Sequence, residues 1–162
     1  MNERKFLIII QARTSSSRLP GKVLLPVAGV TILESIFKRL ERFRDNIIVA
    51  TTRRNIDRTI EYICIQNKIS CFVGDENDVL SRYYNCALYY GATDETLIVS
   101  ITADCPMIDP DLLWDCVSAL QEHQVDYVSN RIERTIPIGL DVEVFSFRAL
   151  KLAQKNARHP WE

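Results

Sequence analysis

Basic and hydroxyl-bearing side chains gather in one short segment near the start of the chain, which has no acidic residue. The basic side chains are those of Arg13, Arg18 and Lys22, and residues 14–17 all carry hydroxyls. The apolar run 6–10 precedes the segment, and helical spacing begins at about Ile32. A buried strand, a basic hydroxyl-rich loop and a helix together supply the donors that bind phosphate in α/β proteins. The segment therefore predicts a phosphate-binding loop, the alternative being a solvated surface loop after an edge strand.

The spacing within this loop does not fit the two common glycine-rich phosphate motifs. A Walker A loop requires a glycine where Ser16 stands and a hydroxyl residue where Val23 stands. The dinucleotide-binding motif Gly-x-Gly-x-x-Gly is absent as well. The loop therefore matches neither of these motifs.

A carboxylate follows a second apolar run in the middle of the chain. Residues 96–101 read as a strand, Asp104 comes just after it, and Pro106 prevents the ladder from continuing. The carboxyl ends of parallel strands face one crevice, so Asp104 and the basic loop are expected to face each other. A carboxylate opposite phosphates is suited to hold Mg²⁺, which prefers oxygen ligands. The alternative is that Asp104 caps the following turn.

The elements that must position these residues alternate along the chain. Strands are expected at residues 6–10, 46–51, 71–73, 96–101, 125–128 and 141–145. Helices are expected at residues 32–43, 56–64, 79–88, 109–120 and 146–156. Alternating strands and helices predict βαβ units and a mostly parallel sheet covered by helices. No repeat or linker divides the 162 residues, so a single domain is expected.

The composition excludes several classes of protein. The net charge is −1, which gives no field for nucleic acid or anionic membrane, so neither is expected as a partner. No apolar stretch approaches the roughly 20 residues of a membrane span. The five cysteines form no C-x-x-C pair and lie mostly in apolar patterns, which favours reduced thiols, a cytoplasmic location and no zinc site.

Four segments together resemble the sugar-acid cytidylyltransferases, the family that makes CMP-activated Kdo and sialic acids. The first is Gln-Ala-Arg-x-x-Ser-x-Arg-Leu-Pro-Gly-Lys at residues 11–22, and the second is residues 74–84, a loop with glycine and acids before a helix. The third is Thr-Ala-Asp-Cys-Pro at 102–106, and the fourth, residues 137–145, is similar to the branch of spore-coat polysaccharide biosynthesis protein F. The resemblance extends from Leu7 to the end of the chain. It implies a three-layer α/β/α fold with a Rossmann-like, mostly parallel sheet of the nucleotide-diphospho-sugar transferase type.

The resemblance also implies roles for individual residues. Catalysis would depend on Arg13, Lys22 and Asp104, with Asp104 as the Mg²⁺ ligand. Nucleotide would contact Gln11, Ala12, Arg13, Ser17, Arg18, Lys22, Arg82 and Thr102. Arg82 falls where relatives place an arginine near the cytosine base, although it could instead pair with neighbouring acids at the surface. Thr102 stands where several relatives carry a base-contacting glutamine, and Asp141 and Glu143 would form a wall of the sugar pocket or fix the preceding loop.

The activity implied is Mg²⁺-dependent joining of CTP to a sugar acid or related sugar, with release of pyrophosphate, in surface polysaccharide biosynthesis. Relatives continue past residue 162 through a dimerisation region and a second metal-binding Asp, so residues 1–162 are expected to be a nucleotide-binding domain lacking that segment. A homodimer is the state implied for the full-length relatives. Two alternatives stay open: a non-catalytic nucleotide-binding module, and a nucleotidyltransferase that uses another nucleotide or a non-sugar alcohol.

Overall fold

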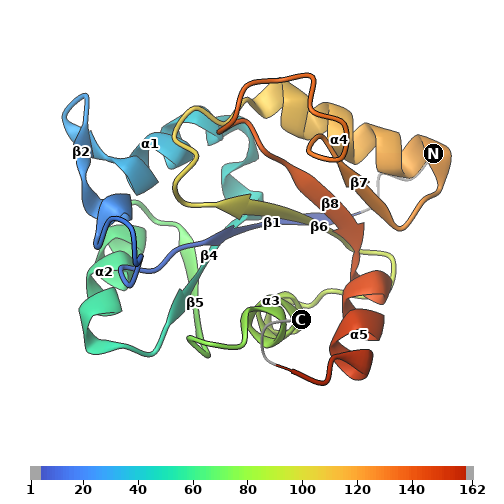
Figure 1. Cartoon of the computed structure of the whole chain (residues 1–162), viewed down its shortest axis with the longest axis horizontal. Helices are drawn as coiled ribbons and strands as arrows, with labels where there is room; N and C mark the ends of the chain where they lie inside the picture. Colours follow the sequence, from blue (N-terminus) through green and yellow to red (C-terminus); the bar gives the residue numbers. More distant parts are fainter. Residues whose placement is uncertain (1–4, 160–162) are drawn as a thin grey trace.

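The protein is built on one six-stranded sheet, seen in a computed structural model that describes residues 5–159 (Figure 1). The strands are β1 (Phe6–Gln11), β4 (Ile47–Thr52), β5 (Ser70–Gly74), β6 (Leu97–Thr102), β7 (Tyr127–Ser129) and β8 (Glu143–Ser146). Their order across the sheet is β5-β4-β1-β6-β8-β7. The first four are parallel to one another, while β8 runs antiparallel to both β6 and β7. The predicted mostly parallel sheet is confirmed.

Helices cover both faces of this sheet. They are α1 (Ile32–Arg39), α2 (Arg58–Gln66), α3 (Val79–Tyr89), α4 (Pro110–His123) and α5 (Phe147–Asn156). Buried side chains of α1, α2 and α4 share one hydrophobic core with the sheet, and those of α3 and α5 share a second core. Figure 1 shows α1 and α4 above the sheet and α3 and α5 below it, which gives the expected three layers. Within residues 5–159, none of the helices combines the length and apolar character needed to cross a bilayer.

The central strand β1 belongs to both cores because its side chains alternate between the two faces of the sheet. Ile8 and Ile10 lie in the core under α1, α2 and α4, whereas Leu7 and Ile9 lie in the core over α3 and α5. All four are buried. A strand buried on both faces reads as a continuous apolar run, which is why the sequence identified it.

Several helices begin at a residue whose side chain caps the free backbone N–H groups. The Thr31 hydroxyl accepts from the Glu34 N–H at 3.2 Å, and the Glu34 carboxylate accepts from the Thr31 N–H at 2.8 Å, which forms a capping box at α1. Asp109 caps α4 and Ser146 caps α5 in the simpler one-sided way. These caps fix where each helix leaves the sheet edge.

The register of the strands brings their carboxyl ends to one level. Gln11, the last residue of β1, pairs with Ala50 of β4 on one side and with Thr102, the last residue of β6, on the other. Antiparallel β8 begins at this same edge, since Glu143 pairs with Ser100. The loops that follow β1 and β6 and the loop that precedes β8 therefore meet at one edge of the sheet.

The structure departs from the sequence prediction mainly in short elements. A two-stranded hairpin, β2 (Pro26–Val27) and β3 (Val30–Thr31), turns through a left-handed Ala28 and Gly29 and was not expected. The first helix ends at Arg39 rather than continuing to Phe43, which lies in a 3₁₀ segment, η2 (Glu41–Asn46). Two further 3₁₀ turns are η1 (Lys22–Leu24) and η3 (Asn55–Asp57).

Candidate functional site

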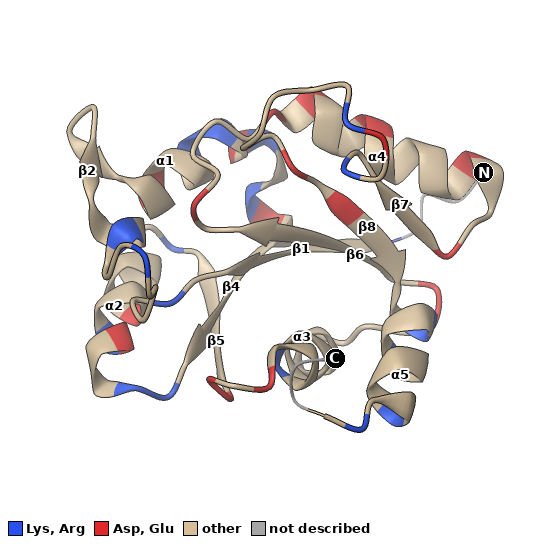
Figure 2. Ribbon diagram, in the orientation of Figure 1, with Lys and Arg blue, Asp and Glu red and all other residues tan. Residues whose placement is uncertain are grey.

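The loop that follows β1 is closed at Thr14 and Gly21, which we call its neck. The Gly21 N–H donates to the Thr14 carbonyl oxygen at 2.8 Å, and Gly21 has φ = 70°, a left-handed conformation that glycine adopts readily. Arg18 lies within the closed loop, Arg13 immediately precedes the neck, and Lys22 immediately follows it at the start of η1. Figure 2 shows the basic residues of this loop beside the end of β1. The neck therefore fixes the backbone next to two cations, Arg13 before it and Lys22 after it.

A buried carboxylate is hydrogen-bonded to Thr14 of the neck. Asp57, at the end of η3, is 0% exposed. Its Oδ1 accepts from the Thr14 N–H at 2.8 Å and from the Thr14 hydroxyl at 2.6 Å, and its Oδ2 accepts from the Thr52 hydroxyl at the end of β4. These bonds connect the loop after β1 to the loop after β4.

Lys22 reaches across the sheet edge to the other predicted site residue. The Lys22 Nζ donates to Asp104 Oδ2, and the two residues are 82 positions apart in the sequence. Burial raises the pKa of Asp104, but hydrogen bonds from Lys22 and Thr102 and the Lys22 charge outweigh it, and the net pKa lies below its ordinary value. Asp104 thus pairs with the basic loop, and within residues 5–159 no backbone N–H of the following turn is bonded to its carboxylate.

The carboxyl ends of β1 and β6 and the basic loop enclose a cleft of about 210 Å³, which we call the phosphate cleft. It is lined by Gln11, Arg13, Ser16, Ser17, Arg18, Lys22, Val23, Thr102, Ala103 and Asp104. Within the described residues, neither Arg13 nor Arg18 has a hydrogen-bonded or ion-pair partner, whereas Lys22 is held by Asp104. Two unpaired guanidinium groups in a polar cleft are donors available to a multivalent anion.

One residue predicted to contact nucleotide lies below this cleft rather than in its lining. Ala12 is 1% exposed, and its N–H donates to the Ala50 carbonyl oxygen at 3.1 Å. That N–H is therefore already used to continue the pairing between β1 and β4. The position supports the floor of the phosphate cleft.

A second cleft of about 340 Å³, which we call the acceptor cleft, continues from the first. The two share Arg18, Thr102 and Asp104, and the remaining lining is Ser100, Cys105, Arg131, Ile138, Gly139, Asp141 and Glu143. The wall from residues 131 to 143 carries charges of both signs, as Figure 2 shows along β8 and the loop before it. Asp141 and Glu143 do line the cleft, as expected for a wall of a substrate pocket.

The charged groups of this wall also pair with one another. Arg131 lies 3.2 Å from Glu143 and 4.0 Å from Asp141, and Arg134 lies 3.0 Å from Asp141. The Tyr127 hydroxyl donates to Glu143 at 3.1 Å. Asp141 and Glu143 therefore line the cleft and also hold the loop that precedes β8, and their contact with a sugar stays a prediction.

Arg82 is placed differently from the surface ion pair considered as its alternative role. It is 1% exposed in α3, and its Nη1 donates to the carbonyl oxygens of Asp75 and Glu76 rather than to their carboxylates. Within the described residues its Nε and Nη2 have no hydrogen-bond partner. Burial lowers the pKa of this guanidinium below its ordinary value. Arg82 does not line the phosphate cleft.

The donor set around Asp104 fits only one mode of metal binding. In residues 5–159, no three His, Cys, Asp or Glu side chains are grouped so as to hold a metal ion. A resident metal with several protein ligands is therefore not supported. Mg²⁺ can also be held by one carboxylate together with phosphate groups of a ligand, and Asp104 lines the cleft that contains the unpaired guanidinium groups.

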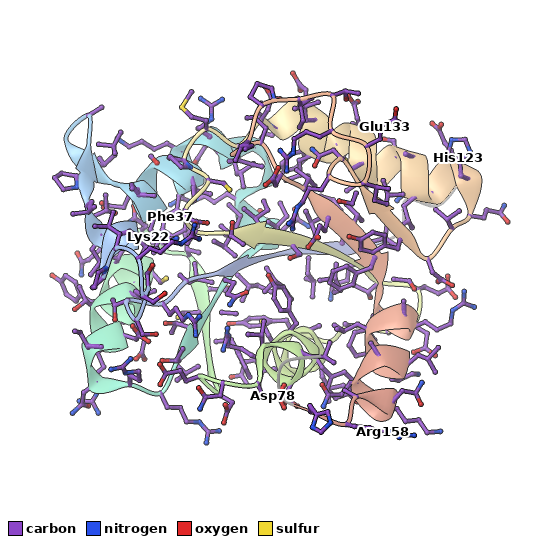
Figure 3. The ribbon with its side chains drawn as sticks, in the orientation of Figure 1. Lys22, Phe37, Asp78, His123, Glu133 and Arg158 are labelled. Carbon is purple, nitrogen blue, oxygen red and sulfur yellow. The ribbon has the colours of Figure 1, made fainter. Side chains whose placement is uncertain are left out.

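Three polar or charged residues take part in the site although the sequence analysis gave them no role there. They are Asp57, Ser100 and Arg131. Asp57 lies at the start of a helical pattern, and no local pattern distinguishes an acid that caps a helix from one that reaches Thr14, 43 positions away. His123 lies at the far end of α4 from Lys22, so it cannot serve the cleft (Figure 3).

Comparisons with known sequences point in one direction. Residues 7–159 match the sequence model of a protein family described as cytidylyltransferase. An uncharacterized protein of Methanocaldococcus jannaschii is 41% identical over 160 residues, which cover 98% of this chain and 63% of the relative. The spore coat polysaccharide biosynthesis protein SpsF of Bacillus subtilis is 35% identical over 150 residues, 89% of this chain and 60% of the relative. The chain spans about three fifths of the length of these curated relatives.

Solved structures are similar over nearly the whole chain. A cytidylyltransferase from Leptospira borgpetersenii has a TM-score of 0.92 at 38% identity, covering 98% of this chain and 67% of its own. CMP:2-keto-3-deoxy-manno-octonic acid synthetase in complex with CTP has a TM-score of 0.69 at 16% identity, covering 96% and 80%. The 4-diphosphocytidyl-2C-methyl-D-erythritol synthase of Anaerococcus prevotii has a TM-score of 0.65 at 13% identity, covering 98% and 80%. The last two establish similarity of fold alone.

Proposed function

The chain belongs to the cytidylyltransferase family, and from this premise we propose that it binds CTP and transfers its cytidylyl group to a sugar acid or related sugar. The observation that carries the proposal is the phosphate cleft at the ends of β1 and β6, which is lined by Arg13 and Arg18, both without a partner among the described residues, and by the Lys22–Asp104 pair. A structure of the same fold was determined with CTP, and a relative that is 35% identical is named for polysaccharide biosynthesis. Both support a role in surface glycan synthesis.

The proposed reaction is an in-line displacement at the α-phosphorus of CTP. A hydroxyl oxygen of the sugar forms a bond to the α-phosphorus, and the bond from that phosphorus to the bridging oxygen of the β-phosphate breaks. The electron pair of the broken bond leaves with pyrophosphate, and the hydroxyl proton leaves to water in the open acceptor cleft. Such a transfer depends on positioning and charge stabilisation rather than on covalent chemistry from the protein.

The chain's own residues supply that positioning. Arg13 and Arg18 would bind the β- and γ-phosphates, and Lys22 would stabilise the charge that develops on the leaving pyrophosphate. Gln11, Ser17 and Thr102 line the same cleft and offer further polar contacts to the nucleotide. Asp104, with the nucleotide phosphates, would hold Mg²⁺. When bound, that ion supplies charge neutralisation at the phosphates.

Arg82 is proposed to lie near the cytosine base. Within residues 5–159 the Nε–H and Nη2–H of this buried guanidinium have no partner, and acceptor atoms of a pyrimidine that reached them would satisfy donors that are costly to leave unpaired. Asp141 and Glu143, which line the acceptor cleft, would contact the hydroxyls of the sugar. All five cysteines are free thiols, which accords with the proposed cytoplasmic location.

Two measurements test this proposal. First, isothermal titration with CTP, UTP, GTP and ATP, each with Mg²⁺, should give the tightest binding for CTP. Equal affinities would refute the cytidine assignment while leaving a phosphate site in place, and no binding would refute the nucleotide proposal itself.

Second, pyrophosphate release should be followed with saturating CTP and a panel of sugar acids and neutral sugars. Release that requires both CTP and one acceptor is the expected result. Binding of CTP without release for any acceptor would favour a non-catalytic binding module. Release with another nucleotide would favour the related transferase with different specificity.

A further inference from the structure

Asp57 is the most fully buried acidic side chain that the catalytic proposal does not use. Both of its carboxylate oxygens accept hydrogen bonds, and all three donors belong to neutral groups of Thr14 and Thr52. Burying a carboxylate is costly, and partners that satisfy both oxygens offset that cost. Such an arrangement calls for an explanation beyond chance placement, because an apolar residue could join α2 to β4 at lower cost.

The hydrogen bonds of Asp57 reach the basic loop at Thr14, one of the two residues that close its neck. Thr14 gives both its N–H and its hydroxyl to Asp57, and its carbonyl oxygen accepts from Gly21. Thr14 is therefore held from three of its polar groups. Arg13 is bonded covalently to one side of this neck and Lys22 to the other.

We propose that Asp57 is a positioning residue that fixes the neck of the basic loop and thereby aims Arg13 and Lys22 at the phosphates. The inference rests on the proposed function, since it assigns the anchoring of the site that binds CTP. One carboxylate at the neck constrains two cations that are nine residues apart in the sequence. A loop without this anchor would have to order itself around each nucleotide that binds, and the ordering would reduce affinity.

The electrostatics of the surroundings agree with this role. Arg13 and Arg82 repel each other, whereas Asp57 and Arg82 attract. The negative charge of Asp57 thus partly offsets the repulsion between the two nearby arginines, Arg13 and Arg82. Its own bonds go to Thr14 and Thr52 rather than to either arginine, so Arg13 remains available to a ligand.

The alternative is that Asp57 only ties β4 to the start of α2 and contributes stability without affecting the ligand. The test must therefore separate loss of stability from loss of loop position. Ser146→Ala provides the matched control, because the Ser146 hydroxyl is also buried and also donates to a carboxylate, that of Asp126 at 2.7 Å, but it caps α5 outside both clefts.

The experiment uses four variants: Asp57→Ala, Thr14→Val, Thr14→Ser and Ser146→Ala. Melting temperature, CTP affinity by titration calorimetry and amide hydrogen exchange without nucleotide are measured for each. Asp57→Ala removes all three bonds. Thr14→Val removes only the hydroxyl bond and keeps the protein testable if Asp57→Ala does not fold. Thr14→Ser keeps the hydroxyl and should restore wild-type behaviour.

We expect Asp57→Ala to weaken CTP binding about tenfold or more, the scale of losing one charge-assisted contact. Thr14→Val should weaken it about fivefold, and Thr14→Ser and Ser146→Ala less than about twofold. Exchange of the Thr14 and Gly21 amides should accelerate in Asp57→Ala and Thr14→Val and stay unchanged in Ser146→Ala, even if that control loses as much melting temperature.

Unchanged CTP affinity and unchanged loop exchange in the Thr14→Val and Asp57→Ala proteins would overturn the proposal. Equal losses of affinity in Ser146→Ala would overturn it as well, because stability alone would then explain the effect. If the wild-type protein does not bind CTP, the proposed function fails, and faster loop exchange in the variants would still decide whether Asp57 fixes the neck.

Discussion

Replacing Asp104 by Asn should change CTP binding in opposite directions with and without Mg²⁺. In the free protein Asp104 holds Lys22, so a phosphate must compete with a carboxylate for this cation. The substitution is nearly isosteric, removes the competing charge and also removes the residue proposed to hold Mg²⁺. The two roles of Asp104 therefore separate in one variant.

The size of the effect without Mg²⁺ follows from the exposure of the pair. The side chains of Lys22 and Asp104 are 23% and 37% exposed, so solvent screens their interaction, and such pairs contribute about 0.2–1 kcal/mol. Releasing Lys22 should therefore strengthen Mg²⁺-free CTP binding by about 1.4- to 5-fold. With Mg²⁺ present, the loss of an ion-held contact should weaken binding by about tenfold or more.

Titration calorimetry with and without a chelator measures both arms. Asp111→Asn is the control: it changes the net charge by the same amount and breaks an exposed pair with Arg42, at 2.6 Å, but Asp111 lines neither cleft. A decrease of the same size in both arms for Asp104→Asn would refute the reasoning, because Asp104 would then support the nucleotide without competing for Lys22.

Three further predictions concern single residues. Arg13→Ala should weaken CTP binding by about 1.5–3 kcal/mol, more than Lys22→Ala does, because among the described residues Arg13 has no partner that it must leave to bind the ligand; calorimetry on both variants tests the order. Gly74→Ala should lower the melting temperature by about 2–12 °C, since its Cβ would lie 2.8 Å from Arg82 Cγ; an unchanged melting curve would contradict this packing. Burial raises the pKa of Tyr83 to about 12, so the folded state keeps its phenol proton while the unfolded chain loses it, and stability should fall as the pH rises from about 10 to 12. Tyr83→Phe should lessen that fall in denaturant titrations at each pH, and an identical slope in the two proteins would count against it.

The main elements could be predicted because their sequence patterns report burial directly. Residues 6–10 of strand β1 are all apolar, and both faces of the strand are covered. The helix expected from residue 109 begins with Asp109 before Pro110, a pair typical of helix starts, and the structure shows that Asp109 accepts from two backbone N–H groups. The hairpin from Pro26 to Thr31 was not predicted, because its turn has Ala28 at φ = 49°, a position where Asn or Gly is the usual sequence signal.

The candidate site was predictable where one residue type implies one kind of partner. Cations without nearby acids indicated phosphate, and an acid after a strand indicated the facing position that Asp104 occupies. Contacts between side chains that are far apart in the sequence were not predictable in this way. Whether Arg131 meets Glu143, or Asp57 meets Thr14, depends on tertiary packing, and no local spacing encodes it. For the same reason, Arg82 resembled a surface residue although it is almost fully buried.

The position of β1 between β4 and β6 has a consequence for how the protein folds. Neither cleft exists until strands far apart in the sequence have paired, and Lys22 meets Asp104 across 82 positions. Parallel pairings of such separation close large loops before any contact compensates the lost entropy, so they form slowly. Nucleotide affinity should therefore appear only in the last phase of refolding, and a partly folded chain would expose the apolar edge of β1 during the interval before β6 arrives.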